Sequence, residues 1–486
     1  MNRKSSKKAK VLTSLLVFIL IFGFFLNFYV EAAKVSRDRI QPTAPKNLKA
    51  ILVTENSVSM TWTASTDNVR VSAYNIYRNS TYIGYTTTTT YTASGLASGI
   101  TYNFTVKAKD VAGNLSYVSN ILTVATTHIL PPLPSSVKKI VGYYAGWSAY
   151  SGFTPDKIDA SKLTHINYAF ANIGSDLKIA MGDSYVDPNN FSKLTNLKQQ
   201  YPNLKTLISV GGWDWSGKFS NVAFTDESRT VFADSCVQFI LQYGFDGVDI
   251  DWEYPVNGGL STNVRRAGDK QNFTLLMQKL REKLDAQGSI DGKSYLLTYS
   301  GAANASYLNN TEPTLLAKYV DYANIMTYDI HGSWDSYTDF NAPLYNNTDS
   351  SPQYKWSADS AVNAWVNAGF PIGKLVMGVP FYGYKYASVN NANNGLYQTF
   401  TGASSISYAG IAANYLNTSG YVRYFHSQSK IPWLFNGSTF ISYEDEQSMG
   451  LKADYVKTKG LAGAMIWELS QDPNKVLLNS LYNGLQ

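Results

Sequence analysis

Residues 246–255 read Asp-Gly-Val-Asp-Ile-Asp-Trp-Glu-Tyr-Pro, an apolar strand with an acidic residue at every second position from Asp249 to Glu253. Side chains alternate along a β-strand, so Asp249, Asp251 and Glu253 point to one side while the apolar residues between them point to the other. In a closed barrel of parallel strands, these sides are the interior and the helix layer. The stretch therefore predicts three carboxylates in a confined interior. Glu253 would lie at the carboxyl end of the strand, where barrel active sites form.

Apolar β-rich runs alternate with helical stretches on both sides of this strand, which is typical of a parallel sheet covered by helices. The runs begin near Ile140, Thr164, Lys205, Gly247, Tyr295, Tyr322, Lys374 and Gly463. Eight strand and helix repeats over residues 138–486 predict an α/β fold, a TIM (β/α)8 barrel longer than the usual ~250 residues. The excess lies mainly at residues 384–446, which are rich in Tyr, Asn, Ser and Gly and predict an inserted α+β module.

The acidic strand has two other interpretations. A solvated edge strand would also carry acidic residues on one face, but the opposite face and the neighbouring runs are strongly apolar, which favours burial. A Ca²⁺ or Mg²⁺ site is the second alternative, although loops rather than strands usually supply such ligands. Carboxylates packed together raise one another's pKa, and this keeps one acid protonated near neutral pH. The pattern therefore favours acid–base chemistry.

Residues 42–127 form short alternating runs separated by Thr, Ser, Gly and Asn, which predicts an all-β sandwich. With Trp62, Leu96 and Tyr102 in place, this segment resembles a fibronectin type III domain, and the spacing of Leu96 and Tyr102 suits a tyrosine corner. We expect Trp62 and Tyr102 to be core residues, and nothing in the segment carries chemistry. Residues 128–137 are Pro-rich and predict an extended linker.

The first 33 residues are typical of an export signal, because basic residues precede an apolar run at 11–30 and a small-residue site at 30–32. The run is also long enough to span a bilayer if it is not cleaved, so a membrane anchor is the alternative. Cleavage after residue 32 would remove five basic residues and one acidic residue, and the formal net charge would change from +6 to +2. We expect a secreted, extracellular protein without stable membrane association after cleavage and without nucleic-acid binding.

The chain has one cysteine, Cys236, so an intrachain disulfide cannot form and stability must come from packing. The pattern around it is helical and apolar, which predicts a buried, inert thiol. The four histidines are scattered, and no cysteine and histidine cluster has zinc-site spacing. We therefore expect no metal and no other cofactor.

Several motifs in one order carry a resemblance to a known family. Residues 246–253 fit D-x-x-D-x-D-x-E, the signature of glycoside hydrolase family 18, and residues 209–213, residues 326–329 and Trp467 fit further motifs of that family. Residues 384–446 resemble its chitinase insertion module. The resemblance covers about residues 138–486 and implies a monomeric enzyme that acts on chitin or chito-oligosaccharides.

The resemblance also implies a division of roles. Glu253 would protonate the glycosidic oxygen, and the 2-acetamido oxygen of the sugar would attack its own anomeric carbon in a retaining, substrate-assisted reaction. Asp251 would accept a hydrogen bond from the acetamido N–H, and Tyr328 would orient the acetamido carbonyl. Asp249 would modulate the proton position between Asp251 and Glu253. Asp246 is expected to brace the strand.

The same resemblance implies a substrate-binding set. The expected residues are Tyr144, Phe170, Gly211, Gly212, Trp213, Tyr254, Met326, Asp329, Tyr382 and Trp467. Trp467 would form the floor under the sugar as well as part of the barrel core, and the two glycines are expected mainly to permit close backbone packing. Many relatives carry an arginine directly after the motif at 379–383, whereas this chain has Tyr384, which puts one polar contact to substrate in doubt.

These features predict a secreted chitinase that hydrolyses β-1,4-linked N-acetylglucosamine polymers. An endo-β-N-acetylglucosaminidase acting on other glycans is an alternative, which the insertion module and Trp213 disfavour. A catalytically silent chitin-binding lectin is another, since fold alone does not give function. Such lectins typically lack the acid that Glu253 supplies here. The sequence does not decide between endo and exo cleavage.

Overall fold

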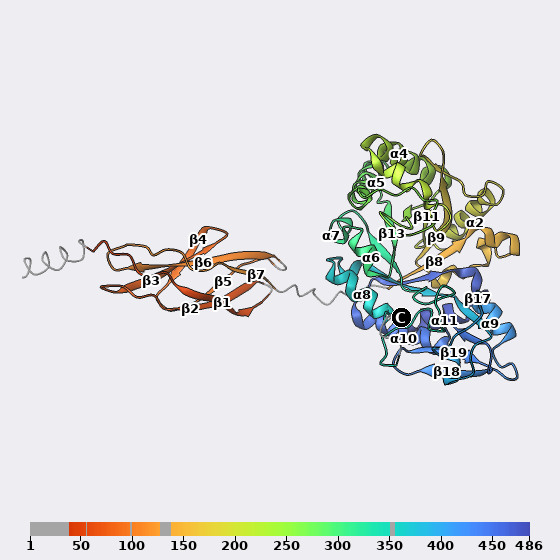
Figure 1. The fold of residues 1–486 in the computed structure, drawn as a ribbon. Helices are drawn as coiled ribbons and strands as arrows, with labels where there is room; N and C mark the ends of the chain where they lie inside the picture. The colour runs from red at the N-terminus through yellow and green to blue at the C-terminus, as the bar shows by residue number, and fades with distance from the viewer. Residues whose placement is uncertain (1–37, 55, 98–99, 127–137, 350–354) are drawn as a thin grey trace, which may run out of the picture. The chain divides into compact units, whose positions relative to one another are not determined.

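The computed structural model describes residues 38–54, 56–97, 100–126, 138–349 and 355–486 (Figure 1). The chain divides into two compact units, Met1–Ser136 and Val137–Gln486. The predicted export signal at 1–33 and the whole of the predicted linker at 128–137 lie outside the described residues.

The N-terminal unit is a sandwich of two antiparallel sheets, as predicted. One sheet has the order β1-β2-β5 and the other β4-β3-β6-β7. The strands are β1 (Lys46–Val53), β2 (Ser57–Thr63), β3 (Val71–Arg78), β4 (Thr81–Thr86), β5 (Thr90–Ser94), β6 (Thr101–Asp110) and β7 (Leu122–Ala125). Trp62 is buried and meets Tyr74 edge to face, with ring centroids 5.4 Å apart. The backbone N–H of Ala97 donates to the hydroxyl of Tyr102 at 2.9 Å, which is the predicted tyrosine corner.

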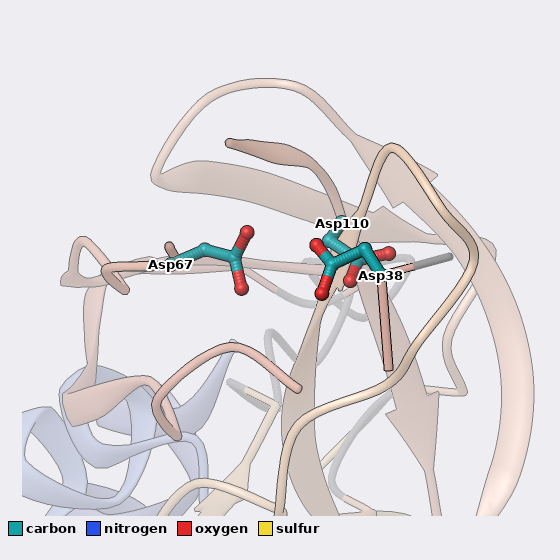
Figure 2. Close-up of side chains that lie close together, drawn as sticks. All are labelled: Asp38, Asp67 and Asp110. Carbon is teal, nitrogen blue, oxygen red and sulfur yellow. The ribbon is translucent and has the colours of Figure 1, made fainter. Parts of the chain in front are cut away.

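Three acidic side chains of this unit lie close together (Figure 2). Carboxylate oxygens of Asp38, Asp67 and Asp110 are all within 4.8 Å of one another. Asp110 is buried and accepts hydrogen bonds from the backbone and side-chain nitrogens of Asn114, and Asp67 accepts two backbone N–H bonds within its own turn. These carboxylates therefore hold the loops at one end of the sandwich.

The second unit contains a closed barrel of eight parallel strands. The strand order is β9-β11-β12-β13-β14-β15-β21-β8, and pairing of β8 with β9 closes the ring. The strands are β8 (Lys139–Ala145), β9 (His165–Ile173), β11 (Lys205–Gly211), β12 (Gly247–Asp251), β13 (Leu296–Ala302), β14 (Tyr322–Met326), β15 (Leu375–Pro380) and β21 (Gly463–Trp467). Each strand begins within one residue of the predicted start of one of the eight runs, so the predicted barrel is confirmed. A short strand, β10 (Ile179–Ala180), pairs antiparallel with β9.

Helices cover the outside of the barrel, as Figure 1 shows for α4 and α5. The α-helices are α2 (Asp187–Gln200), α3 (Phe219–Phe224), α4 (Asp226–Tyr243), α5 (Asp269–Asp291), α6 (Ala305–Asn309), α7 (Pro313–Leu316), α8 (Ala358–Asn367), α10 (Glu446–Lys459) and α11 (Val476–Leu485). The 3-10 helices are η1 (Gly146–Ser151), η2 (Pro155–Lys157), η3 (Ala160–Lys162), η4 (Ser216–Lys218), η6 (Ile372–Lys374), η7 (Asn393–Gly395) and η8 (Leu469–Gln471). In the part of the chain that the structure describes, no helix has both the length and the apolar character needed to cross a membrane.

Strand β12 shows how the sequence divides its side chains between the barrel interior and the surrounding helices. All five of its residues are buried, because apolar Val248 and Ile250 pack into the helix layer while the acidic residues alternate with them. Asp246 braces the start of the strand, since its Oδ2 accepts the backbone N–H of Thr206 at 2.8 Å and pairs with Lys198 Nζ at 2.7 Å. The predicted bracing role of Asp246 is thus confirmed.

Cys236 lies on α4 and is fully buried within the hydrophobic core of the barrel unit. Burial raises the pKa of its thiol well above the ordinary value. The thiol is therefore held in its neutral form, and the predicted burial of Cys236 is confirmed.

An antiparallel sheet is inserted between β15 and β21. Its order is β17-β16-β20-β19-β18. Its elements are β16 (Tyr382–Ala387), β17 (Gly402–Ser407), α9 (Tyr408–Asn414), β18 (Val422–His426), β19 (Ile431–Phe435) and β20 (Phe440–Ser442). A buried ion pair joins Glu444, just after this sheet, to Lys452 of α10, and Lys452 Nζ also donates to the carbonyl of Ala342 at 2.8 Å.

Candidate active site

A pocket of about 770 Å³ is lined by residues at and beyond the carboxyl ends of the barrel strands. This is the end where catalytic groups gather in barrels of this kind. Its lining consists of Tyr143, Trp147, Phe170, Gly211, Trp213, Asp214, Trp215, Asp251, Glu253, Tyr254, Ser300, Ala302, Ala303, Asn304, Met326, Tyr328, Asp329, Ile330, Trp334, Trp356 and Trp467. Six tryptophans and four carboxyl groups dominate, so the pocket offers flat apolar surfaces beside a cluster of acidic side chains.

Glu253 follows β12 and is held by its backbone. Its N–H donates to Ser216 Oγ at 2.8 Å, and its carbonyl accepts from Asn263 Nδ2 at 3.0 Å. The preceding side chain, Trp252, is buried in the opposite direction and stacks on Phe219 with ring centroids 5.5 Å apart. The strand alternation therefore fixes Trp252 in the helix layer and directs Glu253 into the pocket.

The Glu253 carboxyl can hold a proton at neutral pH. Burial is the largest cause that raises its pKa, to about 7, and the negative charges of Asp329 and Asp214 act in the same direction. A hydrogen bond with Tyr254 lowers the pKa but does not offset burial. A carboxyl with this pKa can both donate and accept a proton near pH 7.

Asp251 lies two residues before Glu253 and also lines the pocket. Burial raises its pKa well above the ordinary value, and the charges of Glu253 and Asp249 add to this effect. Its Oδ1 is shielded from solvent and has no hydrogen-bond partner among the described residues. This oxygen is therefore an acceptor that a bound N–H group can use.

Asp249 is fully buried beneath the pocket and does not line it. Thr298 donates to its Oδ1 at 2.5 Å, while Tyr143 and Ser209 donate to its Oδ2 at 2.6 and 2.7 Å. Burial raises its pKa, and these hydroxyl donors lower it. Since its oxygens are already used by hydroxyl donors, Asp249 acts on Asp251 through its charge.

Tyr328 and Asp329 follow β14 and lie on another wall of the pocket. Burial raises the pKa of the Tyr328 hydroxyl far above its ordinary value, so it stays a neutral donor. The backbone at Asp329 is left-handed, with φ 54°, and its N–H donates to Asn341 Oδ1 at 2.8 Å. Asp329 Oδ1 accepts from the hydroxyls of Tyr382 at 2.5 Å and Tyr384 at 2.8 Å.

Trp467, the last residue of β21, is the centre of an aromatic floor. Its ring stacks on Phe170 with centroids 5.7 Å apart, and it also meets Tyr143 at 5.6 Å and Trp147 at 6.4 Å. Trp147 and Trp213 are about half exposed. Such faces complement the apolar face of a pyranose ring.

Most of the predicted site residues meet in this pocket. Those that line it are Phe170, Gly211, Trp213, Asp251, Glu253, Tyr254, Met326, Tyr328, Asp329 and Trp467. Asp249 and Tyr382 lie directly behind the lining, where they contact Tyr143 and Asp329. A Cβ on Gly211 would come within 2.4 Å of the carbonyl oxygen of Asp251.

Tyr144 and Gly212 are not part of the lining. This corrects the expected placement of Tyr144, whereas Gly212 has the packing role that was expected of it. Tyr144 packs in the helix-side core, and its hydroxyl donates to the carbonyl of Phe153 at 3.0 Å. Alternation along β8 directs its neighbour Tyr143 into the barrel instead. Gly212 has φ 76°, and a Cβ there would come within 2.6 Å of the Phe170 ring, so this glycine allows Phe170 to pack closely.

Sequence reasoning missed several lining residues. They are Tyr143, Trp147, Asp214, Trp215, Ser300, Ala302, Ala303, Asn304, Ile330, Trp334 and Trp356. Asp214 and Trp215 directly follow a motif that was recognised, and alternation along β8 could have identified Tyr143. Trp147, Trp334 and Trp356 lie outside the barrel strands, where strand periodicity gives no information.

A proton-carrying carboxyl at the end of a barrel strand, enclosed by tryptophans, is the arrangement of a glycoside hydrolase of the (β/α)8 type. A family model described as glycosyl hydrolases family 18 matches residues 139–472, and a fibronectin type III model matches residues 43–124. The chain therefore belongs to glycosyl hydrolases family 18.

Individual relatives agree with this assignment. The chain is 44% identical over 403 residues to Chitinase A1 of Niallia circulans, and the match covers 71% of this chain but only 58% of that protein. Among solved structures, it is similar to a glycoside hydrolase family 18 N-acetylglucosaminidase from Paenibacillus barengoltzii, with 39% identity, a TM-score of 0.66 and coverage of 72% of this chain and 100% of the other. Chitinase ChiA74 from Bacillus thuringiensis is 38% identical, with a TM-score of 0.69 and coverage of 72% and 70%.

Proposed function

We propose that this protein is a secreted chitinase that acts as a monomer and cleaves β-1,4-linked N-acetylglucosamine polymers with retention of configuration. The observation that carries the proposal is one pair of residues: Glu253, whose pKa is about 7, and Asp251, whose Oδ1 is a free acceptor in the same pocket. The names of the relatives, chitinases among them, support the choice of substrate.

In the first step, the proton of Glu253 moves to the glycosidic oxygen as the bond from that oxygen to the anomeric carbon breaks. The acetamido oxygen of the same sugar forms a new bond to the anomeric carbon, which gives an oxazolinium ion. Asp251 accepts the acetamido N–H and stabilises the positive charge, and Tyr328 orients the acetamido carbonyl. Asp249 adds negative charge beneath Asp251.

In the second step, water attacks the anomeric carbon and the bond to the acetamido oxygen breaks. The Glu253 carboxylate takes the proton from that water, which restores the starting enzyme. Two displacements at one carbon leave the product in the β configuration. The tryptophans of the floor hold the sugar rings by stacking.

The test uses the full chain with chitohexaose and with partly deacetylated chitin, followed by NMR of fresh digests. We expect the β anomer to form first and every new reducing end to be N-acetylated. Initial α product, or glucosamine at new reducing ends, would refute the substrate-assisted mechanism. Binding without cleavage would favour a lectin, and release of glycans from glycoproteins without cleavage of chitin would favour an endo-β-N-acetylglucosaminidase.

A second candidate differs in where the polymer is cut. The similar structure from Paenibacillus barengoltzii is titled an N-acetylglucosaminidase, and its whole length is covered by this chain. On the strength of that title alone, the second candidate is removal of single N-acetylglucosamine units from a chain end. Monosaccharide as the first product from chitohexaose would support exo cleavage, whereas a mixture of dimers to tetramers would support endo cleavage.

A further inference from the structure

Tyr384 contacts two residues of the pocket wall without lining the pocket. It lies on β16 of the inserted sheet, is 7% exposed, and pairs through its backbone with Ser405 and Ser442. Its hydroxyl donates to Asp329 Oδ1 at 2.8 Å, and its ring meets Trp334 edge to face at 5.7 Å. The inserted sheet therefore contacts the pocket wall, from behind, through this side chain.

The partners of Asp329 are neutral. Both Tyr382 and Tyr384 donate hydroxyl hydrogens to its Oδ1, and no lysine or arginine in the described ranges forms an ion pair with it. A phenol orients a carboxylate and leaves its charge in place, whereas a cation would cancel that charge. Burial raises the pKa of the Asp329 carboxyl, and the two phenols that orient it lower this pKa without adding a positive charge to the wall that it shares with Tyr328.

Trp334 is 59% exposed although it lines the pocket. Its ring is supported on one side by Tyr384 and also lies so close to Gly332 that a Cβ there would come within 2.4 Å of it. An exposed indole needs such support to present a fixed face to a sugar. Tyr384 is one of the residues that provide it.

We propose that Tyr384 is a positioning residue for substrate binding, which acts by holding the Asp329 carboxylate and the Trp334 ring in the geometry that the sugar chain meets. This inference rests on the proposed function for its substrate. It assigns to the inserted sheet a direct part in shaping the pocket. Tyr384 takes no part in bond breaking.

The test compares Tyr384→Phe with Tyr386→Phe in the full chain. The second variant is a matched control, because Tyr386 lies two residues along the same strand, is buried, and has a hydroxyl without a hydrogen-bond partner among the described residues. For Tyr384→Phe we expect KM for chitotetraose to rise about tenfold with kcat changed less than about threefold, since one hydrogen bond to a charged group is lost. Tyr386→Phe should leave both constants unchanged, and the two variants should melt at similar temperatures.

A second readout needs no substrate. Burial raises the pKa of Asp329, and the hydrogen bonds from Tyr382 and Tyr384 partly offset that rise. A ¹³C NMR titration of the Asp329 carboxyl should therefore give a still higher pKa in Tyr384→Phe and an unchanged pKa in Tyr386→Phe. An unchanged Asp329 pKa, or equal changes of KM in the two variants, would overturn the proposal. If the wild-type chain does not cleave chitotetraose, the proposed function fails, while the NMR titration still decides the role of Tyr384.

Discussion

Glu253 is the side chain on which turnover should depend most, because it combines a pocket position with a pKa near 7. Glu253→Gln keeps the shape and removes the proton donor, so kcat should fall by a factor on the order of 10² to 10⁴. Binding of chitotetraose should change little. Initial rates and calorimetric titration measure the two effects, and Glu227→Gln, an exposed glutamate on α4, is the control. Near-normal turnover in Glu253→Gln would remove it from the proposed role.

The pH profile follows from the same raised pKa. Glu253 must be protonated to act as the acid, so kcat/KM should fall as pH rises through about 7, by about tenfold per unit beyond that point. The acidic limb reports a group that must be ionised, and we expect that group to be Asp251.

Asp251→Asn should therefore lose most activity and shift the acidic limb of the profile. The amide oxygen of asparagine accepts the acetamido N–H more weakly than a carboxylate does, and the amide carries no charge to stabilise the oxazolinium ion. Rate profiles between pH 4 and 9 for both proteins test this. An acidic limb that stays in place, with activity retained, would show that another group titrates there.

The alternation of side chains along a strand predicted which side chains point into the barrel wherever it was applied. The alternation in β12 correctly separated Glu253 from Trp252, because each is buried in a different layer. The same rule applied to β8 would have selected Tyr143, but the resemblance led to Tyr144. Trp334 and Trp356 could not be predicted, since loop conformation rather than strand alternation brings them to the pocket.

Helix α10 is joined to the segment after β20 by one ion pair that is completely enclosed. Burial raises the pKa of Glu444 and lowers that of Lys452, so each ion depends on the other to remain charged. Lys452→Met leaves an unpaired buried carboxylate and should lower the free energy of unfolding by about 3 to 5 kcal/mol. Urea denaturation measures this loss.

The double variant Lys452→Met, Glu444→Gln provides the control for that loss. Removing both charges avoids the uncompensated carboxylate, so part of the stability should return. An exposed pair, Lys178 with Asp176, gives the comparison, since Lys178→Ala should change stability by less than about 1 kcal/mol. If Lys452→Met and Lys178→Ala lowered the free energy of unfolding equally, burial would not be the reason for the large effect at Lys452.

All residues that line the pocket belong to the barrel unit. A fragment of residues 138–486 should therefore cleave chitotetraose with kcat/KM within about twofold of the full chain, because the soluble substrate meets the same groups. Parallel assays of the two proteins test this. A large loss on the soluble substrate, in a fragment that melts cooperatively, would show that the fibronectin-type unit contributes to the site.

Because Cys236 is the only cysteine in the sequence, reducing agents have no intrachain disulfide to break. Its buried thiol can also report when the barrel opens. The chain has no second cysteine to pair with, and the thiol is enclosed between α4 and the strands. A thiol reagent can react only after the helix layer separates, so the rate of labelling under native conditions measures how often the barrel opens. The protein thus carries a built-in probe that needs no mutation, and substrate that holds the barrel closed should slow the labelling.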